Sequence, residues 1–148
     1  MIRTFIALIS AVLLAGTSCE RDIHKAPEAV ARTFDTMYPG AEMVEWERQL
    51  GNYTADFFFD GHEMEAQFDK KGTWLWSKTE LLLSEVPEAV KQAIDKENDG
   101  KWTVDDIEYY TRSTGETEYY RVTLEKEYSE IERILYIRPE GTPFKYNG

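Results

Sequence analysis

The 148-residue sequence predicts an α+β fold of two tandem repeats, each a helix followed by an antiparallel meander. Both helices are expected to pack on one face of a shared or paired antiparallel sheet. Three observations predict this fold. Apolar residues recur with helical spacing after Pro27 and after Pro87, segments that alternate polar and apolar residues follow each predicted helix, and short sequences recur later in the chain.

The recurring sequences have two different offsets. Ala-Pro-Glu-Ala-Val at 26–30 returns as Val-Pro-Glu-Ala-Val at 86–90, an offset of 86 − 26 = 60. Phe-Asp-Lys-Lys-Gly-Thr at 68–73 corresponds to Ile-Arg-Pro-Glu-Gly-Thr at 137–142, an offset of 137 − 68 = 69. The difference of 69 − 60 = 9 residues is most simply placed in the hairpins of the second copy. We interpret the pattern as an internal duplication, with repeats at 26–80 and 81–148.

Each repeat is predicted to open with a helix. Proline suits the first helical turn because its missing N–H is not needed there, and the glutamate after it lies near the positive end of the helix dipole. Tyr-Pro-Gly at 38–40 and Asn-Asp-Gly at 98–100 are typical helix ends. The apolar stripes that we expect in the core are Val30, Phe34, Met37 and Tyr38 in the first helix, and Val90, Ala93 and Ile94 in the second.

Strands are predicted after each helix. The segment 63–69 alternates polar and apolar residues throughout, which indicates that only one of its faces is buried, and Asp60-Gly61 before it is a typical hairpin turn. The remaining strands are expected at 44–46, 53–59 and 74–76 in the first repeat, and at 107–110, 119–124 and 131–138 in the second.

The first 18 residues have the features of an export signal, with one basic residue, Arg3, ahead of the uncharged segment 5–15. This segment is shorter than the about 20 apolar residues that span a bilayer. Gly-Thr-Ser precedes Cys19, and the arrangement resembles a bacterial lipoprotein signal, in which the cysteine carries lipid. We expect a signal peptide at 1–18, lipidation of Cys19 and a tether at 19–25, in a protein of the periplasm or outer membrane. Simple cleavage with secretion, or a cytoplasmic N-terminal helix, are the alternatives.

Charge and composition exclude several functions. The chain has 17 Lys and Arg against 28 Asp and Glu, a net charge of −11, whereas nucleic-acid binding needs a basic face. The same charge disfavours anionic lipid headgroups, so we expect membrane contact only through lipid on Cys19. One cysteine and two histidines exclude a disulfide framework, a zinc finger and a multi-histidine metal site. The length is enough for one ordinary domain, or for two small halves that share a core.

No motif predicts a catalytic centre, a metal site or a cofactor. The twelve residues 95–106 have the acidic spacing of an EF-hand, but the last is not the bidentate glutamate and a strand is expected after them. Glu63 and Glu65 share one exposed strand face, where nothing separates their pKa values. His24 in the tether and His62 in a hairpin turn have no Cys or Ser nearby with which to form a nucleophile–base pair. We expect no enzymatic activity.

Three motifs resemble a known family. They are Tyr-Pro-Gly-Ala-Glu at 38–42, Phe-Asp-Lys-Lys-Gly-Thr-Trp at 68–74 and Val-Pro-Glu-Ala-Val at 86–90, and they are similar to the exported PepSY-like, beta-lactamase-inhibitor-like proteins of Bacteroides-type bacteria. The resemblance covers nearly all of the expected mature chain, and its motifs are helix caps and turns. It implies tandem α–β repeats and a role in binding a protein or peptide, often regulatory or inhibitory. The second repeat departs from the pattern, with Asn-Asp-Gly-Lys at 98–101.

The strand pattern leaves one face of the sheet without helices. If Met64, Ala66 and Phe68 face the helices, alternate residues of the neighbouring strands face outward. Aromatic residues and arginines are favoured in protein interfaces, so this face is the candidate binding site. The alternative is ordinary cross-strand aromatic packing on a wet sheet. The residues expected to carry the binding are Phe58, Tyr110, Tyr119, Arg121, Ile134, Tyr136 and Arg138.

We therefore predict an exported, non-enzymatic binding module that recognises a protein or peptide of the cell envelope through the helix-free face. The alternative function is that of an envelope scaffold, or of a lipoprotein whose aromatic residues bind a small ligand or a glycan.

Mass spectrometry of the protein from its native host tests the predicted export and lipidation. The expected N-terminus is a lipid-modified Cys19, which leaves 148 − 18 = 130 residues in the mature chain. An intact Met1 ahead of a free Cys19 would contradict the export signal, and the envelope partners with it.

Overall fold

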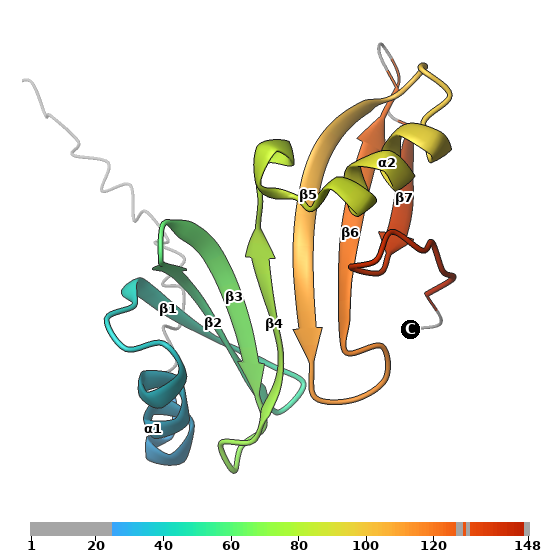
Figure 1. Ribbon diagram of the computed structural model, residues 1–148. Coiled ribbons are helices and arrows are strands. Elements are labelled where there is room, and N and C mark those ends of the chain that lie inside the picture. Colours follow the sequence, from blue (N-terminus) through green and yellow to red (C-terminus); the bar gives the residue numbers. More distant parts are fainter. Residues whose placement is uncertain (1–24, 127–128, 130, 147–148) are drawn as a thin grey trace, which may run out of the picture.

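The seven strands found among the described residues belong to one antiparallel sheet, in which their spatial order follows the chain. The computed structural model describes residues 25–126, 129 and 131–146; Figure 1 shows their two α-helices and the sheet. The predicted α+β class is confirmed, and the sheet is shared between the two halves of the chain. The predicted signal peptide, Cys19 and His24 lie outside the described residues.

The first half contains one helix and four strands. The helix α1 (Glu28–Met37) begins directly after Pro27 and ends just before Tyr38, where the sequence predicts its end. At the turn between β2 and β3, Asp60 and Gly61 have φ values of 51° and 85°, which suit a two-residue hairpin that follows the sheet twist. The strands are β1 (Glu42–Gln49), β2 (Asn52–Phe59), β3 (His62–Phe68) and β4 (Trp74–Glu80).

The second half also contains a helix followed by strands, of which three are described. A short 3-10 helix, η1 (Leu83–Glu85), leads into α2 (Glu88–Glu97), which starts after Pro87. The strands are β5 (Thr103–Arg112), β6 (Glu118–Glu125) and β7 (Glu132–Ile137).

Each helix covers its own hydrophobic cluster. Val30, Phe34 and Tyr38 of the first helical stripe are buried, while Met37 at the edge of the stripe is 37% exposed. The first cluster is Val30, Phe34, Tyr38, Ala55, Phe57, Ala66 and Phe68. The second is Val86, Val90, Ala93, Ile94, Ile107, Tyr120, Val122, Leu124, Leu135 and Ile137. The core is therefore divided in two, where the sequence also allowed a core shared by both halves.

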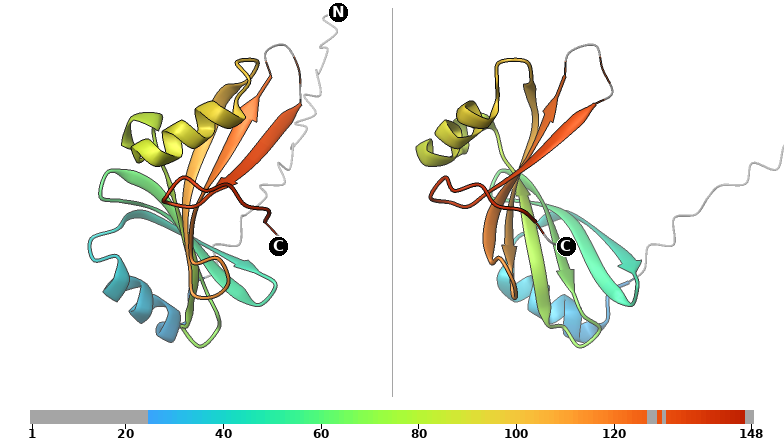
Figure 2. Two further views of the ribbon diagram at one scale, coloured as in Figure 1. Left: turned by 45° about the vertical axis from the view of Figure 1, so that its right-hand side comes forward. Right: turned by 90° about the vertical axis from the view of Figure 1, so that its right-hand side faces the viewer.

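Pairing between β4 and β5 places both helices on the same side of the sheet. Residues that face each other across an antiparallel pair point to the same face. Ser77 pairs with Ala66 beneath α1 and with Thr111 across the boundary between the halves. The next pair on that face is Thr79 with Tyr109, which packs against the cluster beneath α2. The hydroxyl side chains at this boundary separate the two apolar clusters, and the sheet twists strongly between them (Figure 2).

A glycine lies directly beneath the first turn of each helix. Gly72 has φ +86°, and a Cβ on it would lie 2.5 Å from the carbonyl oxygen of Ala29. Gly141 has φ +85°, and a Cβ there would lie 2.5 Å from the carbonyl oxygen of Ala89. Only a residue without a side chain fits so close to a helix backbone in a left-handed conformation. These contacts set the distance between each helix and the turn on which it rests.

Substitution of Gly72 tests this constraint. Gly72→Ala adds both the left-handed strain and a clash with Ala29, so we expect the free energy of unfolding to fall by about 3 kcal/mol. Gly51→Ala is the matched control, because Gly51 has φ +89° but open space around it, and we expect a loss of about 1 kcal/mol. Urea unfolding followed by circular dichroism measures both. Equal losses in the two variants would contradict a close helix contact at Gly72.

Candidate functional site

The sheet face opposite α1 and α2, here called the open face, is the surface that the sequence predicts as the binding site. The structure confirms the predicted alternation on β3, because Ala66 and Phe68 lie in the cluster under α1. Glu63 pairs with Phe58, and Glu65 pairs with Asp56 and Lys78, so these side chains share the opposite face. The open face thus extends over all seven strands.

Tyrosines from three neighbouring strands meet on the second half of the open face. Tyr110 of β5 stacks on Tyr119 of β6, with ring centroids 5.0 Å apart and planes 9° apart. Tyr119 also meets Tyr136 of β7 at 6.0 Å. The set that we call the aromatic cluster adds Trp76 and two residues near the C-terminus, and consists of Trp76, Tyr110, Tyr119, Tyr136, Phe144 and Tyr146. The structure therefore brings three of the predicted site residues into contact.

The other predicted residues lie around this cluster or apart from it. Ile134 is 40% exposed and lies two positions before Tyr136 on β7. Phe58 is half-buried on β2, in the first half of the face. Arg138 follows β7 and binds both carboxylate oxygens of Glu116, at 2.8 and 3.0 Å.

Tyr119 differs from the expectation of an exposed interface residue. Its side chain is 3% exposed, because Phe144 and Tyr146 of the C-terminal segment lie against it at centroid distances of 5.7 Å each. Tyr136 and the C-terminal aromatic residues therefore lie between Tyr119 and solvent. Sequence reasoning did not identify three residues of the aromatic cluster as site residues: Trp76, Phe144 and Tyr146. The signal available for them was their aromatic character.

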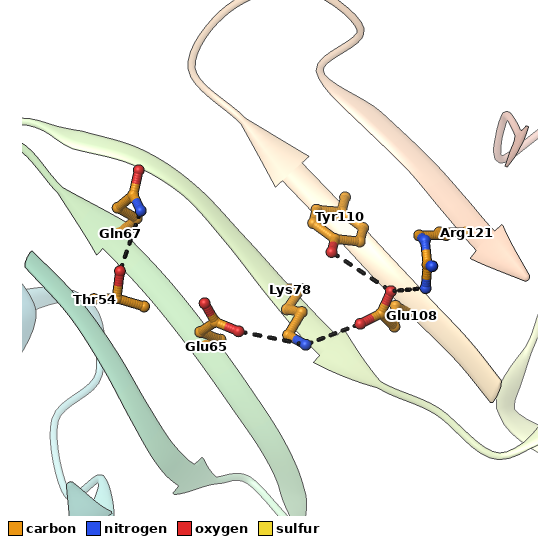
Figure 3. Close-up of polar contacts among 7 residues, drawn as sticks. All are labelled: Thr54, Glu65, Gln67, Lys78, Glu108, Tyr110 and Arg121. Carbon is orange, nitrogen blue, oxygen red and sulfur yellow. Dashed lines mark hydrogen bonds and ion pairs between the residues drawn. The ribbon is translucent and has the colours of Figure 1, made fainter. Parts of the chain in front are cut away.

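Four charged residues form a ladder across the centre of the open face (Figure 3). Lys78 Nζ on β4 donates a hydrogen bond to Glu108 Oε1 on β5 at 2.9 Å, and it lies 3.3 Å from Glu65 Oε2 on β3. Arg121 Nη1 on β6 donates to Glu108 Oε2 at 2.9 Å. Of these residues, sequence reasoning identified Arg121 as a site residue and noted Glu65, but not their connection, because strand register decides which charges meet.

Glu108 is the buried anion of this ladder, with 6% of its surface exposed. Burial alone would raise the pKa of its carboxyl, but hydrogen bonds and charge from Lys78 and Arg121 outweigh burial and lower it. The same contacts overcome the burial of Lys78 and raise the pKa of its ammonium group. Tyr110 beside them is kept neutral, because burial and the charge of Glu108 raise the pKa of its hydroxyl to about 12.

The first half of the open face is acidic and hollowed. A cavity of about 210 Å³ is lined by Met43, Phe58, Lys78 and several carboxylates. Burial is the main cause of the raised pKa values of Asp56, Glu65 and Glu80, and neighbouring carboxylates add to it. A positive group placed there would relieve this repulsion. The carboxylates that line the cavity are Glu45, Asp56, Glu63, Glu65 and Glu80.

Among the described residues we find neither a candidate metal site nor a helix that could span a membrane. Within 25–126, 129 and 131–146, no group of three His, Cys, Asp or Glu side chains has a geometry that could hold a metal ion. The acidic segment that was compared with an EF-hand begins inside α2 and ends on β5. His62 Nε2 lies 2.9 Å from Glu85 Oε1, which ties β3 to η1. In the same part of the chain, no helix is both long and apolar enough to cross a bilayer.

Acid titration of a Glu108→Gln variant tests the charge ladder. Because the pKa of Glu108 is lowered in the folded state, its ionised form stabilises the fold above the ordinary glutamate pKa of about 4.3, and this contribution is lost as the pH falls. We expect the free energy of unfolding of the variant to be about 2 kcal/mol lower than that of the unchanged chain at pH 7. This difference should shrink toward pH 3. Urea unfolding at several pH values measures it.

Glu63→Gln is the matched control for this titration, because Glu63 is an exposed carboxylate on the same face. Its stability should follow that of the unchanged chain at each pH. A deficit of Glu108→Gln that does not change with pH would contradict the ionised role of Glu108.

The fold and the family of the chain are shared with known proteins. Residues 51–142 match the family described as "Putative beta-lactamase-inhibitor-like, PepSY-like". No curated protein is significantly similar to the chain. A solved BLIP-like protein of Bacteroides fragilis is 28% identical with a TM-score of 0.75, and the match covers 82% of this chain and 85% of that one.

Two further solved structures have the same fold. A DUF2874 family protein of Bacteroides ovatus is 25% identical with a TM-score of 0.76, over 82% of this chain and 86% of that one. A protein of Bacteroides eggerthii described with the words "putative periplasmic proteins" is 22% identical with a TM-score of 0.74, over 82% of this chain and 88% of that one. The family match covers 92 of the 148 residues, more than half of the sequence, and the chain therefore belongs to the PepSY-like, beta-lactamase-inhibitor-like family.

Proposed function

We propose that the chain is an exported, non-enzymatic binding protein that recognises a protein or peptide through its open face. The observation that carries this proposal is the placement of both helices on the other side of the sheet, which leaves the open face without a covering helix. The family match and the BLIP-like structural neighbour support a binding role. Occupation of a partner's surface is sufficient for a regulatory or inhibitory effect.

The charge distribution of the open face indicates which kind of partner surface would complement it. Carboxylates dominate the first half, and tyrosines with Arg112, Arg121 and Arg138 dominate the second. A partner with a basic patch beside an apolar or aromatic patch complements both halves in one orientation. The side chains expected to make first contact are the exposed Ile134 and the half-buried Phe58 and Tyr136, while Tyr119 and Arg121 support them from below.

We infer that the two halves, residues 26–80 and 81–148, are copies of one unit. Two equivalent contacts support this: Gly72 under Ala29 and Gly141 under Ala89 have the offsets found in the sequence, 141 − 72 = 69 and 89 − 29 = 60. The strand pairs agree, because Phe68 pairs with Trp74 and Ile137 with Pro143, again 143 − 74 = 69 apart. Two copies with the same handedness, joined through β4 and β5, explain why both helices lie on one face.

We place the protein in the cell envelope, anchored by lipid on Cys19 after cleavage of residues 1–18 and held by the tether 19–25. The N-terminal sequence supports export, and the description of the Bacteroides eggerthii neighbour agrees with it.

Site-specific photo-crosslinking in the native host tests the binding face. A photoreactive residue in place of Ile134, which is exposed on the open face, is expected to give a covalent adduct with one envelope protein. The same residue in place of Arg32 is the control, because its side chain is 72% exposed on α1, on the opposite side of the sheet.

A variant of the face completes this test. Phe58→Ala with Tyr136→Ala, introduced beside the photoreactive residue at 134, should reduce the adduct about tenfold or more, since central aromatic residues dominate many interfaces. Adducts from position 32 but not from position 134, or an adduct that survives the double change, would contradict recognition through the open face.

A further inference from the structure

The C-terminal segment of the chain lies on the open face, where its Phe144 and Tyr146 contact the tyrosines of the aromatic cluster. After β7 the chain turns at 138–142, where Gly141 N–H donates to Arg138 O at 2.8 Å. It then returns along β7: Pro143 pairs with Ile137, and Phe144 N–H donates to Tyr136 O at 2.9 Å. Figure 2 shows this segment passing beside the sheet edge formed by β7. The segment thus lies along the β7 edge, joined to it by an isolated β-bridge and one backbone hydrogen bond.

Two aromatic side chains of this segment fill the site. Phe144 and Tyr146 are half-buried, whereas Lys145 between them is exposed, which is the alternation of an extended strand. Tyr146 stacks on Tyr136 with centroids 4.9 Å apart, and Phe144 meets Tyr136 at 5.9 Å. The geometry of the site therefore accepts two rings separated by one residue.

Arginines complete the site around these rings. The Arg138 guanidinium lies 4.7 Å from the centre of the Phe144 ring. Arg112 lies 5.7 Å from the centre of the Tyr146 ring, and its Nη1 donates a hydrogen bond to the Tyr146 hydroxyl. These contacts recognise the rings themselves, by cation–π attraction and by hydrogen bonding. No feature of the site requires that the rings belong to the same chain.

The segment is held loosely compared with the strand at the equivalent place in the first half. There, β4 pairs with β3 over five positions, from Phe68–Trp74 to Met64–Thr79. Among the described residues beyond Thr142, Phe144 N–H makes the one backbone hydrogen bond to β7. A short segment with so few backbone bonds opens at much lower free energy than a core strand. The site beneath it is then available.

We propose that the part of the aromatic cluster beneath Phe144 and Tyr146 is a docking site for an extended partner segment that carries two aromatic residues separated by one residue. This part consists of Trp76, Tyr110, Tyr119 and Tyr136. Phe144 and Tyr146 hold this site until such a segment replaces them and adds as a strand to the β7 edge. The inference rests on the proposed protein-binding function and names the element that the partner contributes.

Peptide binding to a vacated site tests the inference. The probe is a fluorescent peptide with the sequence Thr-Pro-Phe-Lys-Tyr-Asn-Gly of residues 142–148, and its control has alanine at both aromatic positions. In the full chain, Phe144→Ala with Tyr146→Ala vacates the site. We expect the probe to bind this variant at least about tenfold more tightly than the unchanged chain, where the tethered segment competes at an effective concentration on the order of 1 mM.

Three further variants sharpen the measurement. Lys145→Ala removes an exposed side chain and should leave probe binding as weak as in the unchanged chain. Arg112→Ala in the vacated chain should weaken binding about threefold or more. Tyr146→Ala alone should give an intermediate affinity, and circular dichroism checks that each variant is folded.

Equal probe affinity for the vacated and unchanged chains, or equal affinity of the alanine peptide, would overturn the inference. A dimer of the unchanged chain that becomes monomeric when the two rings are removed would assign the site to a second copy, and would overturn a partner segment as its occupant. Failure of the probe to bind, combined with an adduct from position 134, would reject this docking mode while the open face stays a binding surface.

Discussion

The pairing of β4 with β5 is the constraint on which the other features of the molecule depend. Five consecutive residue pairs, from Trp76–Arg112 to Glu80–Glu108, join the two halves into one sheet. Since paired residues share a face, this register places α1 and α2 on the same side. Each helix can then bury its apolar stripe without covering the other side, and a face of seven strands is left without a helix.

Ion pairs on the open face also connect the strands at the boundary between β4 and β5. Lys78 of β4 contacts carboxylates on both neighbouring strands, and Arg121 supplies the second cation for Glu108. A buried carboxylate is tolerated there because both of its oxygens have charged donors. The ladder also separates an acidic region from an aromatic one.

Much of the fold could be predicted from local pattern. Pro27 and Pro87 mark the helix starts, and the alternation around Met64 assigns β3 to the correct face, because these signals depend on residues close together in the chain. The division of the core could not be predicted, since it results from the hydroxyl side chains that Ser77, Thr79 and Thr111 place at the β4–β5 boundary.

The candidate site was predictable in its location but not in its organisation. Tyr110, Tyr119 and Tyr136 were assigned to one face by strand alternation, and the structure brings them into contact. The burial of Tyr119 depends on a chain reversal after β7 that returns Phe144 and Tyr146 to the sheet, and no periodic pattern signals such a contact. The contact between Lys78 and Glu108, which are 30 positions apart in the chain, likewise depends on the register of β4 with β5.

Hydroxyl-radical footprinting of the complex with the crosslinked envelope partner tests recognition through the open face most directly. Two methionines serve as internal reporters: Met43, 75% exposed, lines the acidic cavity, and Met37, 37% exposed, lies on α1. The account predicts that the partner protects Met43 and Tyr136 from oxidation and leaves Met37 unchanged. Protection of Met37 with full oxidation of Met43 and Tyr136 would contradict it.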